Sequence, residues 1–164
     1  MTELVGPAGG DPQIGDLATP VNSSAFSKAF INNLPAYRQG LSTQRRGLEV
    51  GMAHGFFLFG PFLVTGPLRL TEYAATAGVL SAVGLVMILT VALSLYGSVT
   101  NFKPAPSVTT ETPPENLGSK EDWSEFASGF FIGGCGGALF AFLICLTPHL
   151  DALQGVAKAI WSVM

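Results

Sequence analysis

Two ionisable side chains, Glu49 and His54, lie in or beside a stretch of sequence that is apolar enough to cross a membrane. Ionisable groups at membrane depth cost free energy and are usually functional. Five residues along an α-helix turn through about 140°, so these side chains point to different faces and cannot chelate one metal ion together. The sequence contains neither an HExxH motif nor the paired Glu-x-x-His motifs of a di-iron site. We therefore expect each group to act alone.

A lone neutral histidine can supply the axial ligand of a metal that a macrocycle already holds, such as haem iron or chlorophyll magnesium. A lone carboxylate could do the same for magnesium, because this hard ion accepts oxygen ligands. For His54, the alternative is a hydrogen bond to a neighbouring helix. For Glu49, it is a salt bridge with Arg45 or Arg46 near the start of the helix. The residue types alone leave these alternatives open.

Small and aromatic residues add two weaker signals. Four phenylalanines cluster around His54 and could line a tetrapyrrole or a carotenoid, although such residues more often face lipid or pack between helices. They are Phe56, Phe57, Phe59 and Phe62. A later apolar stretch carries a face of small residues that would let a second helix or a flat pigment ring come close. Its glycines are Gly129, Gly133 and Gly137.

The elements that position these residues are located by three uncharged stretches. These stretches are Val50–Leu68, Tyr73–Phe102 and Phe126–Leu150. About 20 apolar residues suffice to cross a bilayer, so each stretch predicts a transmembrane helix. The predicted helices span 46–65, 74–99 and 124–147. We expect the first to be kinked near Pro61, and its alternative is a re-entrant half-helix that ends there.

Composition supports a membrane protein and excludes several other classes. The 164 residues are 48% hydrophobic but only 12% charged, with a mean hydropathy of +0.44. Eight basic residues and a net charge of −3 argue against a nucleic-acid-binding protein. Two cysteines provide neither a disulfide framework nor a zinc site. Since no catalytic motif is found either, the sequence predicts a non-enzymatic, all-α integral membrane protein with one domain over 1–164.

The remaining segments are connectors. Residues 1–44 read as an extended arm, 103–119 as a Pro-rich loop, and 148–164 as a tail with a short interfacial helix. Six of the eight basic residues lie in or beside the arm and the loop after the second helix, which puts both on the cytoplasmic side and the C-terminus on the other. The acidic, Gly/Pro-rich start has the features of neither a signal peptide nor a transit peptide, which favours a bacterial source.

Composition and motifs leave two classes of function. One is a pigment- or haem-binding subunit of a larger complex. The other is a small structural or transport subunit of another membrane complex, which uses Glu49 and His54 to move protons or ions. An absorption spectrum of the purified protein separates the two classes.

Four segments together resemble one known family. They are NNLPAYRQGLS at 32–42, RRGLEVGMAHGFFLFGPF at 45–62, GPLR at 66–69 and SKEDWSEFASGF at 119–130. The sequence is similar to the photosystem I reaction centre subunit XI (PsaL) family, cyanobacterial type, over roughly residues 18–147. The stretch RRGLEVGMAHG is long and unusual, so it carries most of this resemblance.

The resemblance implies a thylakoid protein with three transmembrane helices and bound chlorophyll a and β-carotene. In a thylakoid, the distribution of basic residues then predicts a stromal N-terminus and a lumenal C-terminus. His54 and Glu49 each match a chlorophyll-magnesium ligand of the family. The implied partners are lipids, the large core subunits and small neighbouring membrane subunits of photosystem I. Copies of the chain itself are a further implied partner across the axis of a trimer or a tetramer. The family is not catalytic on its own.

The sequence departs from the family at one position. Trimeric cyanobacterial members tend to carry an acidic residue directly after GPLR, where it helps to hold calcium between monomers. Leu70 stands there in this chain, which counts against that calcium site, and Glu72 would need a different geometry. The loop at 103–119 resembles the longer loop of tetramer-forming members.

Overall fold

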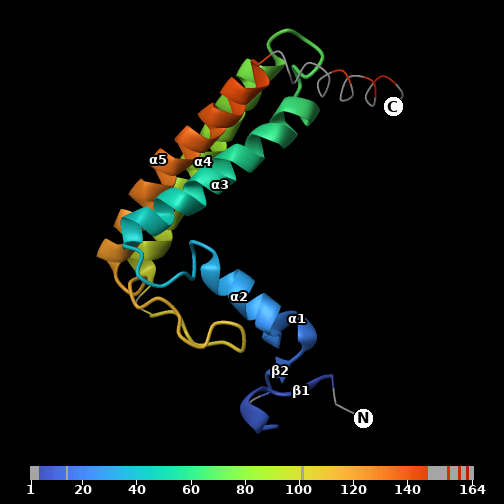
Figure 1. The fold of residues 1–164 in the computed structure, drawn as a ribbon. Coiled ribbons are helices and arrows are strands. Elements are labelled where there is room, and N and C mark those ends of the chain that lie inside the picture. The colour runs from blue at the N-terminus through green and yellow to red at the C-terminus, as the bar shows by residue number, and fades with distance from the viewer. Residues whose placement is uncertain are drawn as a thin grey trace.

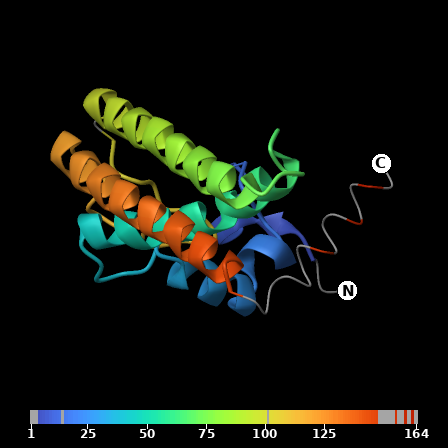
Figure 2. The ribbon, with the colours of Figure 1, turned by 90° about the horizontal axis from the view of Figure 1, so that it is seen from above.

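Three long helices lie side by side and form the body of the molecule (Figures 1 and 2). The computed structural model describes residues 4–147 except 14 and 101, together with 155, 159 and 162. The N-terminal arm lies at the end of the bundle where the first long helix begins (Figure 1). The apolar residues of the expected interfacial helix, Leu153, Val156, Ile160 and Trp161, lie outside the described residues.

The three long helices are α3 (Thr43–Thr65), α4 (Ala74–Val99) and α5 (Lys120–Cys145). Each is long and apolar enough to cross a membrane, so the prediction of an all-α membrane protein is confirmed. Helix α3 continues past Pro61 to Thr65, so the re-entrant half-helix is not what forms.

Polar caps fix where the long helices begin. Ser42 caps α3 by accepting a hydrogen bond from the Arg45 backbone N–H. Ser119 and Asp122 form a reciprocal capping box, so α5 begins at Lys120 and not at 124. The helix ends at Cys145, with Leu146 as its C-cap, and not at the predicted 147, a position that the following Pro148 disfavours for helical backbone.

Glycines bring the backbones of α3 and α5 into direct contact. A Cβ atom at Gly133 would overlap the carbonyl oxygen of Leu48, and one at Gly137 would overlap that of Met52. The contact is reciprocal, because a Cβ at Gly51 would overlap the carbonyl oxygen of Phe130. The glycine face of α5 therefore packs against α3 of its own chain, and is not free to receive another copy or a pigment ring.

Helix α4 completes the bundle through two apolar clusters. The first joins Phe59 of α3 to Ala82 of α4 and to Ala138 and Ala141 of α5. The second centres on Val86, Phe126 and Phe130. The outer surface of α4 is apolar and exposed, as expected for a face turned to lipid or to other membrane components.

The arm contains short elements that precede the bundle. Strands β1 (Gly6–Pro7) and β2 (Leu17–Ala18) pair antiparallel around a 3-10 turn, η1 (Ala8–Gly10). Two helices follow, α1 (Pro20–Ser23) and α2 (Ala25–Asn33).

Candidate functional site

His54 lies on the outer surface of α3, where its side chain is exposed. Its Nδ1 atom lies 2.8 Å from the backbone carbonyl oxygen of Val50, one turn earlier in the same helix. A carbonyl oxygen can only accept, so Nδ1 carries the proton and the lone pair is on Nε2. The hydrogen bond therefore runs within its own helix and not to a neighbouring one, and it leaves Nε2 available as a ligand.

The ring of Phe130 supports the His54 imidazole from α5. The two ring centroids lie 5.5 Å apart with planes inclined by 60°, an edge-to-face contact. Phe130 itself is only 3% exposed, so it is a fixed wall. The imidazole is held by Val50 on one side and by Phe130 on another, which restricts the directions that Nε2 can take.

His54 is a single ligand. No group of three or more His, Cys, Asp or Glu side chains that could hold a metal occurs in the described part of the chain. A metal bound at Nε2 would need its other ligands from elsewhere, as the magnesium of a chlorophyll or the iron of a haem has them from its macrocycle. The donor fits such a group, since neutral imidazole is a common ligand for both kinds of metal centre.

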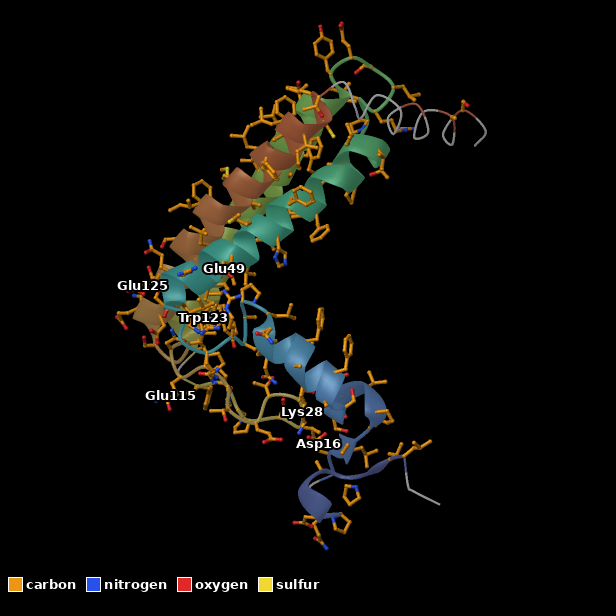
Figure 3. All side chains as sticks on the ribbon, in the orientation of Figure 1. Asp16, Lys28, Glu49, Glu115, Trp123 and Glu125 are labelled. Atoms are coloured by element: carbon orange, nitrogen blue, oxygen red, sulfur yellow. The ribbon has the colours of Figure 1, made fainter. Side chains whose placement is uncertain are left out.

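Glu49 lies in a basic environment at the start of α3 (Figure 3). One carboxylate oxygen pairs with Arg38 of the arm, and the other lies 3.2 Å from Nε of Arg45, one turn earlier. The side chain is 23% exposed. The salt bridge expected with Arg45 is thus present. Arg46 makes none with the described part of the chain and donates instead to the carbonyl oxygens of Pro35 and Leu41.

The carboxylate of Glu49 still fits a magnesium ion in one respect. Each of its oxygens has a second lone pair beyond the one that the arginine occupies. The carboxylate and its two arginines together carry one net positive charge, so any ligand role of this oxygen is played in a positively charged environment. Glu49 and His54 share no contact, as the offset along the helix predicts.

The phenylalanines around His54 divide between core and surface. Phe59 is 3% exposed and belongs to the core, and Phe62 packs against the same cluster. Phe56 and Phe57 are exposed, by 38% and 73%. Of the four, these two offer the most ring surface to a pigment outside the chain, and Phe57 lies nearer the His54 face by helical position.

Two features of the site could not be found from the sequence. Arg38 is separated from Glu49 by a turn at Gly40, and no spacing rule connects the two. Phe130 belongs to another helix, and its contact with His54 depends on the register of α3 against α5. The hydrogen bond to Val50, by contrast, follows from the i–4 spacing in a helix.

Leu70, where the resemblance led us to look for a calcium ligand, is exposed and offers no oxygen from its side chain. It lies in the connection between α3 and α4, and the nearby Glu72 is also exposed. One chain therefore offers a single carboxylate in this connection, which falls short of the six or more oxygen ligands that calcium prefers.

Comparison with known proteins points to one family throughout. The family model described as photosystem I reaction centre subunit XI matches residues 4–150. A photosystem I reaction center subunit XI of Picosynechococcus is 69% identical over 138 residues, which are 84% of this chain and 91% of the relative. The corresponding protein of Crocosphaera subtropica is 63% identical over 147 residues, 90% and 94% of the two chains. That of Synechococcus elongatus is 59% identical over 157 residues, 94% and 95%.

Proposed function

Because the chain belongs to the photosystem I reaction centre subunit XI family, we propose that it is an antenna and structural subunit that binds chlorophyll a at His54 and at Glu49. Family membership makes it a non-catalytic membrane subunit that associates with other photosystem I subunits, and its three apolar helices suit a thylakoid membrane. We further propose which pigments the chain binds, which way it is oriented in the membrane and that it forms contacts within an oligomer.

One observation carries the pigment proposal, namely the orientation of His54. Its Nδ1 proton is held by Val50, and its Nε2 lone pair is free on the outer surface of α3. A chlorophyll would supply the absorbing ring and its magnesium. The chain supplies one axial ligand there and, at the exposed Phe57, an apolar surface for the pigment. The role is to hold pigments at a fixed distance and orientation, so that they pass excitation on.

Substitution of His54 by Leu tests this proposal. The side chain is exposed, so the helix should still insert, while photosystem I should lose one chlorophyll or show a shifted absorption band. Ile88→Leu on α4 is the control, because it changes an exposed apolar side chain of the bundle away from the proposed ligand and its pigment contact. An unchanged pigment count and spectrum in the His54→Leu complex would contradict the assignment.

A pair of substitutions separates the ligand role of Glu49 from its ion pairs. Glu49→Gln and Glu49→Ala both remove the charge that pairs with Arg38 and Arg45. Only the glutamine keeps an oxygen that can bind magnesium. If Glu49 is a ligand, the chlorophyll remains in the Gln variant and is lost or shifted in the Ala variant. Equal spectra for the two variants would contradict the ligand role.

We propose β-carotene as the second pigment, along the exposed apolar surface of the bundle, and self-association of the subunit within a photosystem I oligomer. The family resemblance supports both. The chain's own glycine face does not serve as the oligomer contact, because α3 already covers it. The alternative of proton or ion movement needs Glu49 and His54 in one path, and their separate faces give it no support.

A further inference from the structure

Helix α2 of the arm exposes its apolar face and covers its polar face, the reverse of what a helix on a water-facing surface does. The exposed side chains recur at helical spacing and are almost all apolar: Ala25, Phe26, Ala29, Phe30 and Asn33. The half-buried side chains between them are mainly polar: Ser27, Lys28, Ile31 and Asn32. An amphipathic helix normally turns its apolar face inward. Here the protein covers the polar face, and the apolar face is left outside.

The exposed apolar surface is concentrated in two aromatic rings. Phe26 and Phe30 are 78% and 56% exposed, and their rings stack with centroids 6.2 Å apart and planes inclined by 8°. They lie one turn apart on α2 and form one continuous patch. In a chain surrounded only by water, such a patch would be unfavourable, and its usual meaning is a protein or membrane contact.

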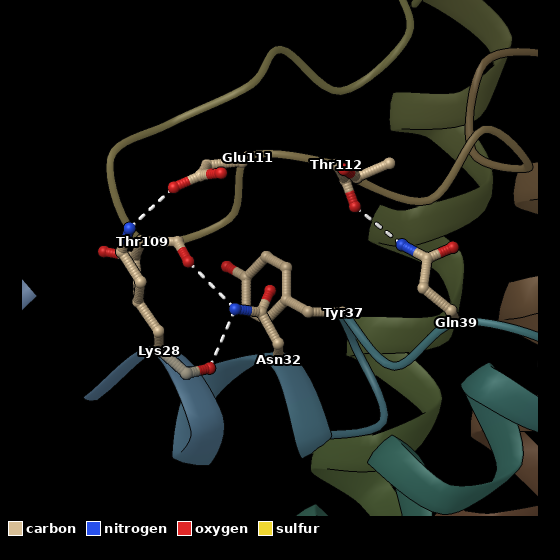
Figure 4. A pocket seen from close by; sticks show the side chains of 7 residues that line it. All are labelled: Lys28, Asn32, Tyr37, Gln39, Thr109, Glu111 and Thr112. Atoms are coloured by element: carbon tan, nitrogen blue, oxygen red, sulfur yellow. Dashed lines mark hydrogen bonds and ion pairs between the residues drawn. The ribbon is translucent and has the colours of Figure 1, made fainter. Parts of the chain in front are cut away.

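The polar face of α2 is held by the 103–119 loop. Lys28 Nζ lies 2.6 Å from a carboxylate oxygen of Glu111, and the Asn32 side-chain amide donates to the Thr109 carbonyl oxygen at 2.9 Å (Figure 4). A third contact joins the Thr109 hydroxyl to the Asn22 carbonyl oxygen of the preceding helix α1 at 2.8 Å. The loop thus covers one side of α2 and fixes which way the phenylalanines face.

The position of α2 relative to the long helices indicates what lies on its other side. Helix α2 runs crosswise to the bundle, close to the end where α3 begins (Figure 1). Lys28 leaves α2 on the side away from the long helices (Figure 3). Phe26 and Phe30 are each two positions from Lys28, about 200° around the helix. They therefore point to the opposite side of α2, toward the region in which the long helices lie. The long helices are apolar enough to cross a bilayer, so this side of α2 is the one that would face the membrane.

We propose that α2 lies flat on the membrane surface, with Phe26 and Phe30 inserted in lipid at the boundary between head groups and acyl chains. Arg38 and Arg45 share the single carboxylate of Glu49, so this end of the bundle keeps one positive charge in excess, which suits a lipid surface that carries anionic head groups. The helix then acts as an anchor that holds the arm and the 103–119 loop at a fixed height above the bilayer. This proposal does not depend on pigment binding at His54 or Glu49.

Photocrosslinking in intact photosystem I within its membrane tests the proposal. A benzoyl-phenylalanine is introduced at position 26 or 30, and at Glu111 as a control, which is exposed on the opposite side of the arm. After illumination, mass spectrometry of the subunit should show adducts of membrane lipid at 26 and 30 and none at 111. Crosslinks from 26 and 30 to another polypeptide would overturn the proposal, and so would an absence of lipid adducts at both positions.

A second variant covers the case in which the bulky side chain prevents assembly. Ala29 is exposed on the same face, so Ala29→Cys can carry a benzophenone attached through maleimide. The unsubstituted chain, with Cys135 and Cys145, gives the background of this labelling. Lipid adducts above that background support the membrane contact, and crosslinks to protein alone refute it.

Discussion

Glu49 and His54 differ in what already occupies their polar atoms. His54 has one nitrogen bound to its own helix and the other free on the surface. Glu49 has both oxygens engaged by arginines, one of which comes from the arm. The histidine is therefore a ligand of fixed orientation, whereas the carboxylate also connects the arm to α3.

The ion pairs of Glu49 predict that substitution of Arg38 and substitution of Arg45 have different effects on docking of the arm. Arg38→Gln removes the pair that joins the arm to α3, and should weaken docking of the arm by about 1 kcal/mol, the upper end of the usual range for exposed pairs. Arg45→Gln removes a pair within α3 and should leave the arm in place. Limited proteolysis of the arm measures this, with faster cleavage expected only for Arg38→Gln. Equal cleavage of both variants would show that the pair does not hold the arm.

Single residues also show the limit of sequence reasoning at this scale. The i–4 relations of His54 to Val50 and of Glu49 to Arg45 follow from helix geometry once the helix is predicted. The contact of Glu49 with Arg38 depends on the path of a turn, and that of His54 with Phe130 depends on helix register. Long-range contacts of this kind have no local sequence pattern.

At the scale of elements, the close approach of α3 and α5 predicts opposite effects for two neighbouring glycines. A Cβ at Gly133 would overlap the Leu48 carbonyl oxygen, whereas one at Gly136 would meet nothing within 4 Å. Gly133→Ala should therefore force the helices apart and destabilise the subunit by roughly 1–3 kcal/mol, as overpacking of a core does. Gly136→Ala should be neutral or slightly stabilising. Thermal release of the subunit from the purified complex compares the two, and an equal loss in both would refute the packing.

The contact between the arm and the loop should depend on pH. A hydrogen bond from Lys28 and its positive charge lower the pKa of the Glu111 carboxyl below its ordinary value of 4.5. A lowered pKa in the folded state means that the contact is fully stabilising above the ordinary value and is lost as the pH falls through the lowered one. The protection factors of the loop amides, which compare the exchange rate with the intrinsic rate at the same pH, should fall in that acid range. Glu111→Gln should abolish this part of the pH profile, and a profile that it leaves unchanged would contradict the assignment.

Hydropathy alone predicted the three long helices, and residues 74–99 were expected where α4 forms. It did not predict that the glycine face of α5 packs against α3, because a face of small residues indicates close packing without identifying the partner. It also did not predict that the polar side of α2 would be the covered one. That arrangement depends on where the 103–119 loop folds back, which only the whole chain determines.

At the scale of the whole molecule, the arm and the 103–119 loop must lie on the same side of the membrane, because hydrogen bonds join them. The distribution of basic residues predicts that this side is the stroma. Glu111→Cys should therefore react with an impermeant maleimide added to thylakoid vesicles whose stromal face is outside. Glu72→Cys, in the exposed connection at the other end, should react only after the vesicles are opened. The reverse pattern would mean that the predicted orientation is wrong.

The last prediction concerns self-association of the subunit. The glycines Gly129, Gly133 and Gly137 are covered by α3 of the same chain, so they cannot form the contact between copies. The proposed contact then falls to the apolar tail, and deletion of 149–164 should convert photosystem I oligomers to monomers on a sucrose gradient. Gly136→Leu is the matched control, because it adds bulk to the outward face of α5 without touching the packing with α3. Oligomers at the wild-type yield after the deletion would exclude the tail. Dispersal by Gly136→Leu alone would assign the contact to the outer face of α5 instead.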